Sequence, residues 1–264
     1  MIHLVDSHAH LGMEDFDQDR DEVIQKAKKA GIKAILCPGE VTDPKNLQVT
    51  LEMTKKYPSI LATAGVHPHQ AKDFTGEAIH KIKSLARKNQ IQAIGEIGLD
   101  FHYNFSPPEQ QMTAFQAQLN LAQQLNLPVI IHSRLAAGAV AECIDKEGFT
   151  QGGILHCFTE SYEFAQSMLD KAFYISFSGI ITFAKASDLK EIAKKLPLNR
   201  LLIETDSPYL TPVPYRGRVK RNEPIYIKEI ALNLATLKSV PLEKLAEVTT
   251  KNFENCLRFE FKNF

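Results

Sequence analysis

The feature of this sequence that most restricts its fold is a regular alternation between short apolar runs and longer amphipathic segments. Strands that alternate with helices form parallel sheets, and near-continuous apolar strands suit a sheet that is covered on both faces. The pattern therefore predicts an α/β protein with eight parallel strands. The expected strands are residues 2–5, 33–37, 60–64, 91–97, 128–131, 153–155, 173–177 and 200–203.

The segments between these runs show a helical period. In residues 109–125, Met112, Phe115, Leu119 and Ala122 recur three or four positions apart and mark one buried helix face. Two prolines before Glu109 are a helix-start signal. Further helices are expected at residues 19–30, 44–57, 76–88, 162–170 and 188–196, and after the last strand at 223–237 and 242–257.

Periodicity alone allows either an open doubly wound sheet or a closed barrel. No G-x-G-x-x-G follows the first strand, which counts against dinucleotide binding. The chain has 264 residues, and barrels of about 250 residues commonly form one domain. We expect a single domain over residues 1–264, with additional helices at its C-terminal end.

Composition restricts the partners and the compartment. Lysine plus arginine equals aspartate plus glutamate, 31 each, so any attraction to nucleic acid has to be local. The four cysteines are scattered and read as reduced thiols, no signal peptide is evident, and no apolar run approaches the length of a membrane helix. We expect a cytoplasmic protein with no membrane partner and no obligate protein partner.

Six metal-ligand residue types follow or end expected strands. They are His8, His10, Glu96, His132, His156 and Asp206. His8 and His10, two positions apart on an extended chain, point to the same side. In a barrel, the carboxyl ends of all strands meet on one face. An H-x-H pair alone is weak support for metal binding; the whole pattern predicts a centre of imidazole and carboxylate ligands.

Six ligands exceed the three or four that one zinc ion uses, which favours two divalent ions of the Mg, Mn or Zn type. Glu96 is the expected bridge between them, because it comes from the middle of the strand order. Among the other histidines, His3 and His80 are expected to be structural or solvated. His67, His69 and His102 are expected on the active face, the last two as loop residues.

The motifs resemble those of the TatD family of metal-dependent deoxyribonucleases, within the amidohydrolase-like barrels. They are DSHAHL (6–11), GVHPH (65–69), GEIGLD (95–100), the segment 106–134, ISFSGIITF (175–183), IETDSPYLTPVPYRG (203–217) and KRNEP (220–224). The resemblance runs almost end to end. It implies a (β/α)8 TIM barrel, a dinuclear centre on the six ligands above, and hydrolysis of DNA phosphodiesters, often from the 3′ end.

The sequence also departs from the family pattern. Leu135 and Gly138 stand where the family usually has acidic residues, and Thr159-Glu160 replaces a usual Ser-Gly. Two residues are inserted before Lys220. No metal ligand is lost, so the departures concern ligand orientation and substrate contacts.

The expected chemistry is hydrolysis by metal-activated water, with Asp206 and Glu96 as catalytic carboxylates and Asp206 as candidate proton acceptor. DNA, as single strands or 3′ ends, is the favoured substrate. The alternatives are an ester or amide hydrolase, such as an aminoacyl-nucleic-acid deacylase or a small cyclic amidohydrolase, and a non-catalytic metal-binding scaffold.

Side chains that can carry positive charge near the expected site predict a substrate that contains phosphate. The candidate contacts are His67, Arg134, Arg216, Arg218, Lys220 and Arg221. For the last four, a solvated surface run is the competing interpretation. Cys37, Ser178 and Pro208 are each expected to close a strand near the catalytic face, and residues 89–90 and 198–199 to lie at the opposite face.

Overall fold

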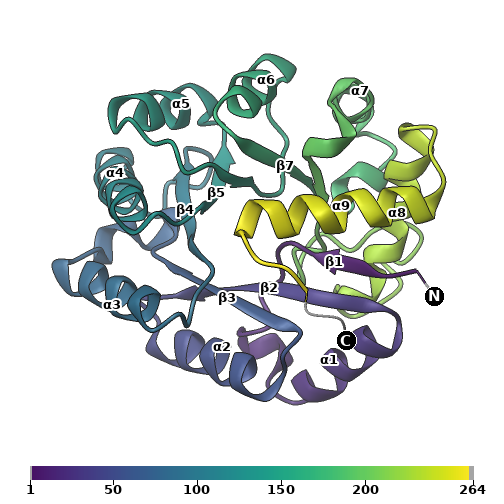
Figure 1. Cartoon of the computed structure of the whole chain (residues 1–264), viewed down its shortest axis with the longest axis horizontal. Helices are drawn as coiled ribbons and strands as arrows, with labels where there is room; N and C mark the ends of the chain where they lie inside the picture. The colour runs from purple at the N-terminus through teal and green to yellow at the C-terminus, as the bar shows by residue number, and fades with distance from the viewer. Residues whose placement is uncertain (1, 262–264) are drawn as a thin grey trace.

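The strands form a closed barrel surrounded by helices. The computed structural model describes residues 2–261, and within them eight parallel strands pair in sequence order. The first and last strands meet through backbone hydrogen bonds: Ser7 N–H donates to Ile203 O at 3.0 Å, and Asp206 N–H donates to His8 O at 2.9 Å. Figure 1 shows the helices as an outer ring around the strands. The expected (β/α)8 barrel is confirmed.

The elements alternate along the chain as the apolar pattern predicts. The strands are β1 (Leu4–Asp6), β2 (Ile32–Glu40), β3 (Ile60–Gly65), β4 (Ala93–Asp100), β5 (Val129–Arg134), β6 (Gly153–Leu155), β7 (Phe173–Phe177) and β8 (Leu201–Ile203). The helices are α1 (Arg20–Lys29), α2 (Pro44–Lys56), α3 (Gly76–Arg87), α4 (Pro108–Leu125), α5 (Ala137–Lys146), α6 (Tyr162–Asp170), α7 (Ser187–Lys195), α8 (Ile227–Leu237) and α9 (Leu242–Leu257). The helix α5 is an addition to the segments expected from the sequence.

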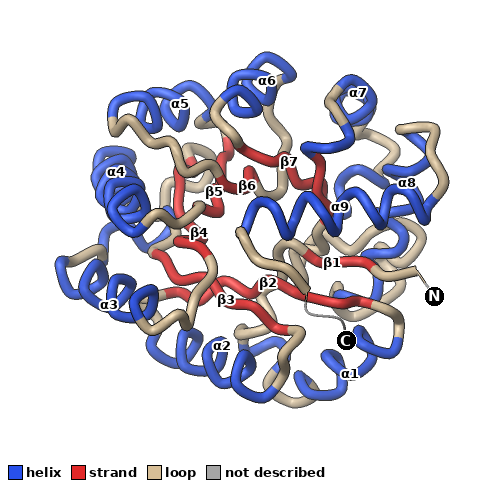
Figure 2. The backbone as a smooth tube through the Cα atoms, in the orientation of Figure 1, coloured by secondary structure: helices blue, strands red, loops and turns tan. Residues whose placement is uncertain are grey.

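The interior of the barrel is closed at one end by α9. Alternate strand residues such as Val5, Ile130 and Leu202 form a buried cluster with Phe253 of α9. The Asn252 side chain donates hydrogen bonds to the carbonyls of Leu198 and Leu201, at the start of β8. Figures 1 and 2 show α9 crossing one end of the strands. The amino ends of the strands are therefore covered, and the loop at 198–199 lies opposite the expected site, as predicted.

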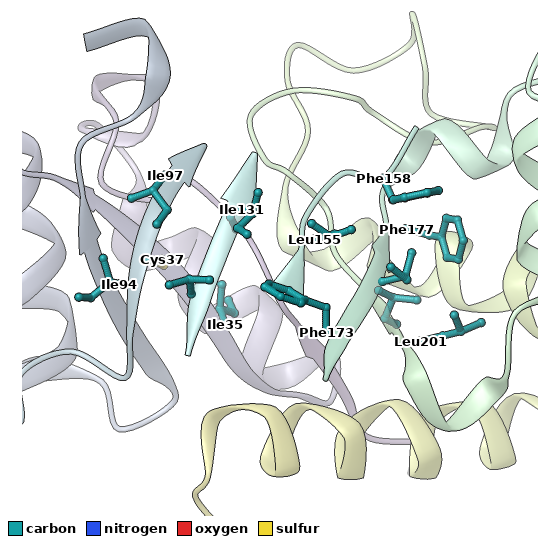
Figure 3. Packing of buried hydrophobic residues seen from close by; sticks show 14 of the residues in the cluster. Ile35, Cys37, Ile94, Ile97, Ile131, Leu155, Phe158, Phe173, Phe177 and Leu201 are labelled. Carbon is teal, nitrogen blue, oxygen red and sulfur yellow. The ribbon is translucent and has the colours of Figure 1, made fainter. Parts of the chain in front are cut away.

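A second hydrophobic layer joins the strands to the surrounding helices. Figure 3 shows part of it, with Ile35, Cys37, Ile97 and Ile131 packed among buried neighbours. Cys37 does not close its strand, because β2 continues to Glu40 and the thiol is buried in this layer. The expectation that Cys37 ends a strand is wrong, whereas Ser178 and Pro208 do lie beyond the ends of β7 and β8.

A bulge in β4 decides where Glu96 points. Ile94 pairs with Val129, but Ile97 pairs with Ile131, so three residues of β4 span two steps of β5. Side chains two positions apart on a regular strand share a face, which would place Glu96 with Ile94 in the helix-facing layer. The extra residue reverses the alternation, and Ile97 joins that layer instead. The Glu96 carboxylate is thereby turned toward the barrel mouth.

Two expectations concern the chain as a whole. The expected single domain extends over residues 1–264, and its ends at residues 1 and 262–264 lie outside the described residues. Between residues 2 and 261, no helix has both the length and the apolar content required to cross a membrane.

Gly98 provides a test of the close packing of β4 on β5. Its φ is +138°, and a Cβ at this position would lie 2.0 Å from the carbonyl oxygen of His132. We expect Gly98→Ala to lower the free energy of unfolding by about 2 to 5 kcal/mol, through backbone strain and overpacking. Urea denaturation monitored by circular dichroism measures it.

Gly138 is the matched control, because a Cβ there meets no atom within 4 Å and the residue lies in α5. Gly138→Ala is expected to raise the free energy of unfolding by up to about 1 kcal/mol, since alanine favours helix. Equal denaturation midpoints for the two variants would contradict the packing argument.

Candidate metal centre

All six expected ligands converge at the carboxyl end of the barrel. His8 and His10 follow β1, His156 follows β6, and Asp206 lies three residues after β8. Glu96 and His132 lie within β4 and β5, because these strands continue to Asp100 and Arg134. The expectations that Glu96 ends the fourth strand and that His132 follows the fifth are therefore wrong. The set has the imidazole and carboxylate donors that divalent metals bind.

One group of ligands gathers around Oε2 of Glu96. His8 Nε2 lies 3.2 Å from this oxygen, and His10 Nε2 lies 3.7 Å from it. Asp206 Oδ1 lies 3.2 Å from His10 Nε2 and 4.0 Å from His8 Nε2. Four possible metal-binding atoms, supplied by β4 and by the loops after β1 and β8, therefore lie close together.

A second group gathers around Oε1 of the same carboxylate. His156 Nε2 lies 2.7 Å from this oxygen, His132 Nδ1 lies 3.0 Å from it, and His67 Nε2 lies 3.2 Å from it. His67 was expected only as a substrate contact, yet its ring is as close to Glu96 as those of the expected ligands. It follows β3, so this strand also contributes an imidazole beside the carboxylate.

Buried oxygens without partners show that these residues fit a cation. Among residues 2–261, Glu96 Oε2 and Asp206 Oδ1 are buried side-chain atoms that accept no hydrogen bond, although each lies 3.2 Å from an imidazole nitrogen. A buried unpaired carboxylate oxygen is costly unless it binds a positive group. Three groups of side chains are close enough to hold an ion: His8, His10 and Asp206; His8, Glu96 and His156; and His67, Glu96 and His132.

The electrostatics of the cluster follow from burial and from mutual charge. Burial lowers the pKa of the His67 imidazole to about 4. Burial also opposes ionisation of Glu96, but the positive charge of the adjacent His156 imidazole outweighs burial and holds the pKa of that carboxyl well below its usual value. Glu96 is therefore an ionised carboxylate at neutral pH, which is the form that binds metal.

Two carboxylates outside the expected set orient the histidine ligands from behind. Asp100 Oδ2 lies 3.3 Å from His132 Nε2, and Glu204 Oε1 lies 3.3 Å from His156 Nδ1. Such partners fix the ring orientation and tautomer of a metal ligand. Their signal in the sequence was an acidic residue within GEIGLD and ETDSPYL, close to the ligands themselves.

The remaining histidines divide as their surroundings dictate. His69 Nε2 lies 2.8 Å from Asp100 Oδ2, so this residue belongs to the outer layer of the site. His102 and His80 are exposed, and His3 is exposed just before β1 rather than within it. The expectation that His3 lies inside the first strand is wrong, because β1 begins at Leu4.

The basic segment after β8 contains both free and paired cations. Arg216, Arg218 and Lys220 are exposed, and the Arg216 guanidinium lies 3.9 Å from the centre of the Phe183 ring. Arg221 instead forms ion pairs with Asp19 at 2.6 Å and with Glu223 at 3.2 Å. Its charge is neutralised by these carboxylates, so Arg221 anchors the segment to the chain before α1.

The loop after β6 places a carboxylate at the end of β5. No acidic side chain is available at Leu135 or Gly138, but Glu160 from the loop after β6 reaches the same corner. Its Oε1 accepts a hydrogen bond from Ser133 Oγ at 2.9 Å. A carboxylate therefore still contacts the end of β5, supplied by the neighbouring loop.

A closed barrel whose carboxyl end brings histidines and carboxylates together in this way has the architecture of a metal-dependent hydrolase. A family model described as TatD related DNase matches residues 5–258. The chain therefore belongs to the family of TatD-related DNases and is a metal-dependent hydrolase that acts on ester bonds.

Relatives and solved structures agree with this membership. The chain is 43% identical over 256 residues to an uncharacterized metal-dependent hydrolase, YabD, of Bacillus subtilis, covering 97% of this chain and 99% of the relative. It is 36% identical to the 3′-5′ ssDNA/RNA exonuclease TatD of Salmonella typhimurium, with 94% and 96% covered. The crystal structure of YJJV, a TatD homolog from Escherichia coli, superimposes with a TM-score of 0.89 at 26% identity, over 97% of this chain and 98% of that one.

Proposed function

We propose that this chain hydrolyses phosphodiester bonds of DNA, from the 3′ ends of single strands, and that two divalent ions would be held there with Glu96 as their shared ligand. The observation that carries the proposal is that imidazoles approach both oxygens of this carboxylate: His8 lies nearest Oε2, and His156, His132 and His67 lie nearest Oε1. The Salmonella relative named as a 3′-5′ ssDNA/RNA exonuclease supports the substrate class.

Divalent ions of the Mg, Mn or Zn type, when bound here, would acidify water and neutralise phosphate charge. Asp206 Oδ1, buried beside His10, is positioned to accept the proton of the attacking water. The water oxygen forms a bond to phosphorus as the bond from phosphorus to the leaving sugar oxygen breaks. Glu96 connects the two sides of the site. Its Oε2 lies 3.2 Å from His8 Nε2, and its Oε1 lies 2.7 Å from His156 Nε2.

His67 and Arg134 are the proposed contacts to the phosphate being cut. Arg134 ends β5, two residues after His132, so its side chain shares the inward face of that strand. His67 lies beside Glu96 Oε1. Donors in these positions stabilise negative charge that develops on phosphate oxygens. Arg216, Arg218 and Lys220 are the proposed contacts to more distant phosphates.

The proposed stoichiometry is directly measurable. Titration of chelator-treated protein with Mn²⁺, followed by calorimetry, is expected to show two ions per chain. His132→Ala is expected to bind one ion, because it removes a ligand from the Oε1 group alone. His80→Ala, an exposed histidine on α3, is the control and keeps both ions. Saturation of the wild-type protein at one ion would contradict the dinuclear proposal.

Hydrolysis of a 5′-labelled single-stranded oligonucleotide with Mg²⁺, Mn²⁺ or Zn²⁺ tests the reaction. Asp206→Asn keeps the shape of the side chain and removes its basicity, so we expect turnover to fall about 10²- to 10⁴-fold. Ion binding is measured on the same variant, to separate a lost base from a lost ligand. Parallel assays with an aminoacyl ester and a cyclic amide contradict the proposal if those substrates are turned over and DNA is not.

The basic segment is tested through the salt dependence of DNA binding. Arg218→Ala combined with Lys220→Ala is expected to reduce the slope of log K against log salt by about 0.7 for each phosphate of a single strand that the variant no longer neutralises. The control removes two exposed lysines, Lys28 and Lys29, at the far end of α1. If the two double variants show the same slope as the wild-type protein, the segment makes no phosphate contact.

A further inference from the structure

The loop after β4 presents two aromatic rings to solvent beside the metal centre. Tyr103 is 49% exposed and Phe105 is 59% exposed. Their rings are parallel within 3°, with centroids 5.4 Å apart. Two stacked rings that remain this exposed are an unusual use of apolar surface, because burial of either ring would stabilise the fold.

Exposed apolar side chains are concentrated at this end of the barrel. Six large hydrophobic residues are exposed among residues 2–261. Five of them, namely Tyr103, Phe105, Leu135, Tyr209 and Val213, lie in the loops after β4, β5 and β8, and Leu232 lies on α8. An apolar surface gathered around a polar centre indicates a ligand that has both apolar and charged parts.

The first part of this loop is held by the carboxylate that contacts the candidate ligand His132. Oδ1 of Asp100 accepts hydrogen bonds from the backbone N–H groups of His102 and Tyr103, at 2.9 and 3.0 Å. Oδ2 of Asp100 contacts His69 and His132. One side chain therefore contacts both the start of the loop that carries the rings and the candidate ligand His132.

Neighbouring residues complete the surface around the rings. The His69 ring meets Phe105 edge-on, with centroids 4.8 Å apart and an angle of 87° between the planes. The Arg134 guanidinium lies 4.6 Å from the centre of the Tyr103 ring. A cation with five donors thus lies against the aromatic pair, two residues along β5 from the candidate ligand His132.

We propose that Tyr103 and Phe105 form a stacking site for an unpaired nucleobase, next to the phosphate that Arg134 contacts. This inference rests on the proposed function and adds the position of the base. A nucleotide combines a flat apolar base with an anionic phosphate, which matches exposed rings beside a guanidinium. The surface selects single strands, because a base paired within a duplex has both faces covered by its neighbours.

Equilibrium binding tests the stacking site without requiring turnover. A 5′-labelled single-stranded oligonucleotide is titrated with protein carrying Asp206→Asn, in the presence of Mg²⁺, and fluorescence anisotropy gives Kd. Phe105→Leu in this background removes the ring and is expected to weaken binding about 5- to 100-fold. Phe105→Tyr keeps a ring and is expected to restore binding to within a factor of about two.

An abasic residue at the 3′ end of the oligonucleotide provides the second arm of a double-mutant cycle. If base and ring contact each other, Phe105→Leu has a much smaller effect on the abasic oligonucleotide than on the intact one. Leu232→Ala on α8 controls for removal of exposed apolar surface and leaves both affinities unchanged. Equal effects of Phe105→Leu on the two oligonucleotides, or equal binding by Phe105→Leu and Phe105→Tyr, overturn the stacking site.

The outcome is separable from that of the proposed function. Failure of the wild-type protein to cleave DNA overturns the reaction, whatever the binding cycle shows. If the wild-type protein cleaves DNA but Phe105→Leu weakens binding of the intact and the abasic oligonucleotides equally, the proposed reaction stands and the stacking site is overturned. A wild-type preference for duplex over single-stranded ends of the same sequence also overturns it.

Discussion

The arrangement of the site depends on one buried carboxylate, Glu96, placed among histidines at the mouth of the barrel. A carboxylate removed from water is costly unless positive groups surround it, and imidazoles from four different strands or the loops after them lie within 3.2 Å of its two oxygens. The bulge in β4 makes this possible, because regular alternation would turn Glu96 toward the helices. A one-residue irregularity in β4 thus places the carboxylate around which the imidazoles gather.

The two ends of the barrel have different chemical roles. At the amino end, α9 covers apolar side chains such as Val5 and Ile130, which supplies stability without polar atoms to satisfy. At the carboxyl end, Asp100 and Glu204 hold His132 and His156 from behind. Apolar packing at the amino end stabilises the fold. This stability offsets the cost of desolvating the buried charged groups at the carboxyl end.

Neighbouring segments at the mouth contact one another in space. Glu160, from the loop after β6, accepts a hydrogen bond from Ser133 at the end of β5. Arg221 is paired with Asp19, so the segment after β8 is fixed to the start of the chain. Residues from separate loops therefore contribute to one surface at the carboxyl end. A barrel can in this way vary its substrate contacts while it keeps its metal ligands.

The sequence by itself determined the alternation of strands and helices and the choice of six candidate ligands, because apolar periodicity and the order of parallel strands place strand ends on one face. Only the tertiary structure decided which ligand faces which oxygen of Glu96. The bulge that turns this side chain, the pairing that neutralises Arg221 and the approach of His67 all arise between segments distant in sequence. Local propensity carries no information about such contacts, since they depend on how the closed barrel brings its loops together.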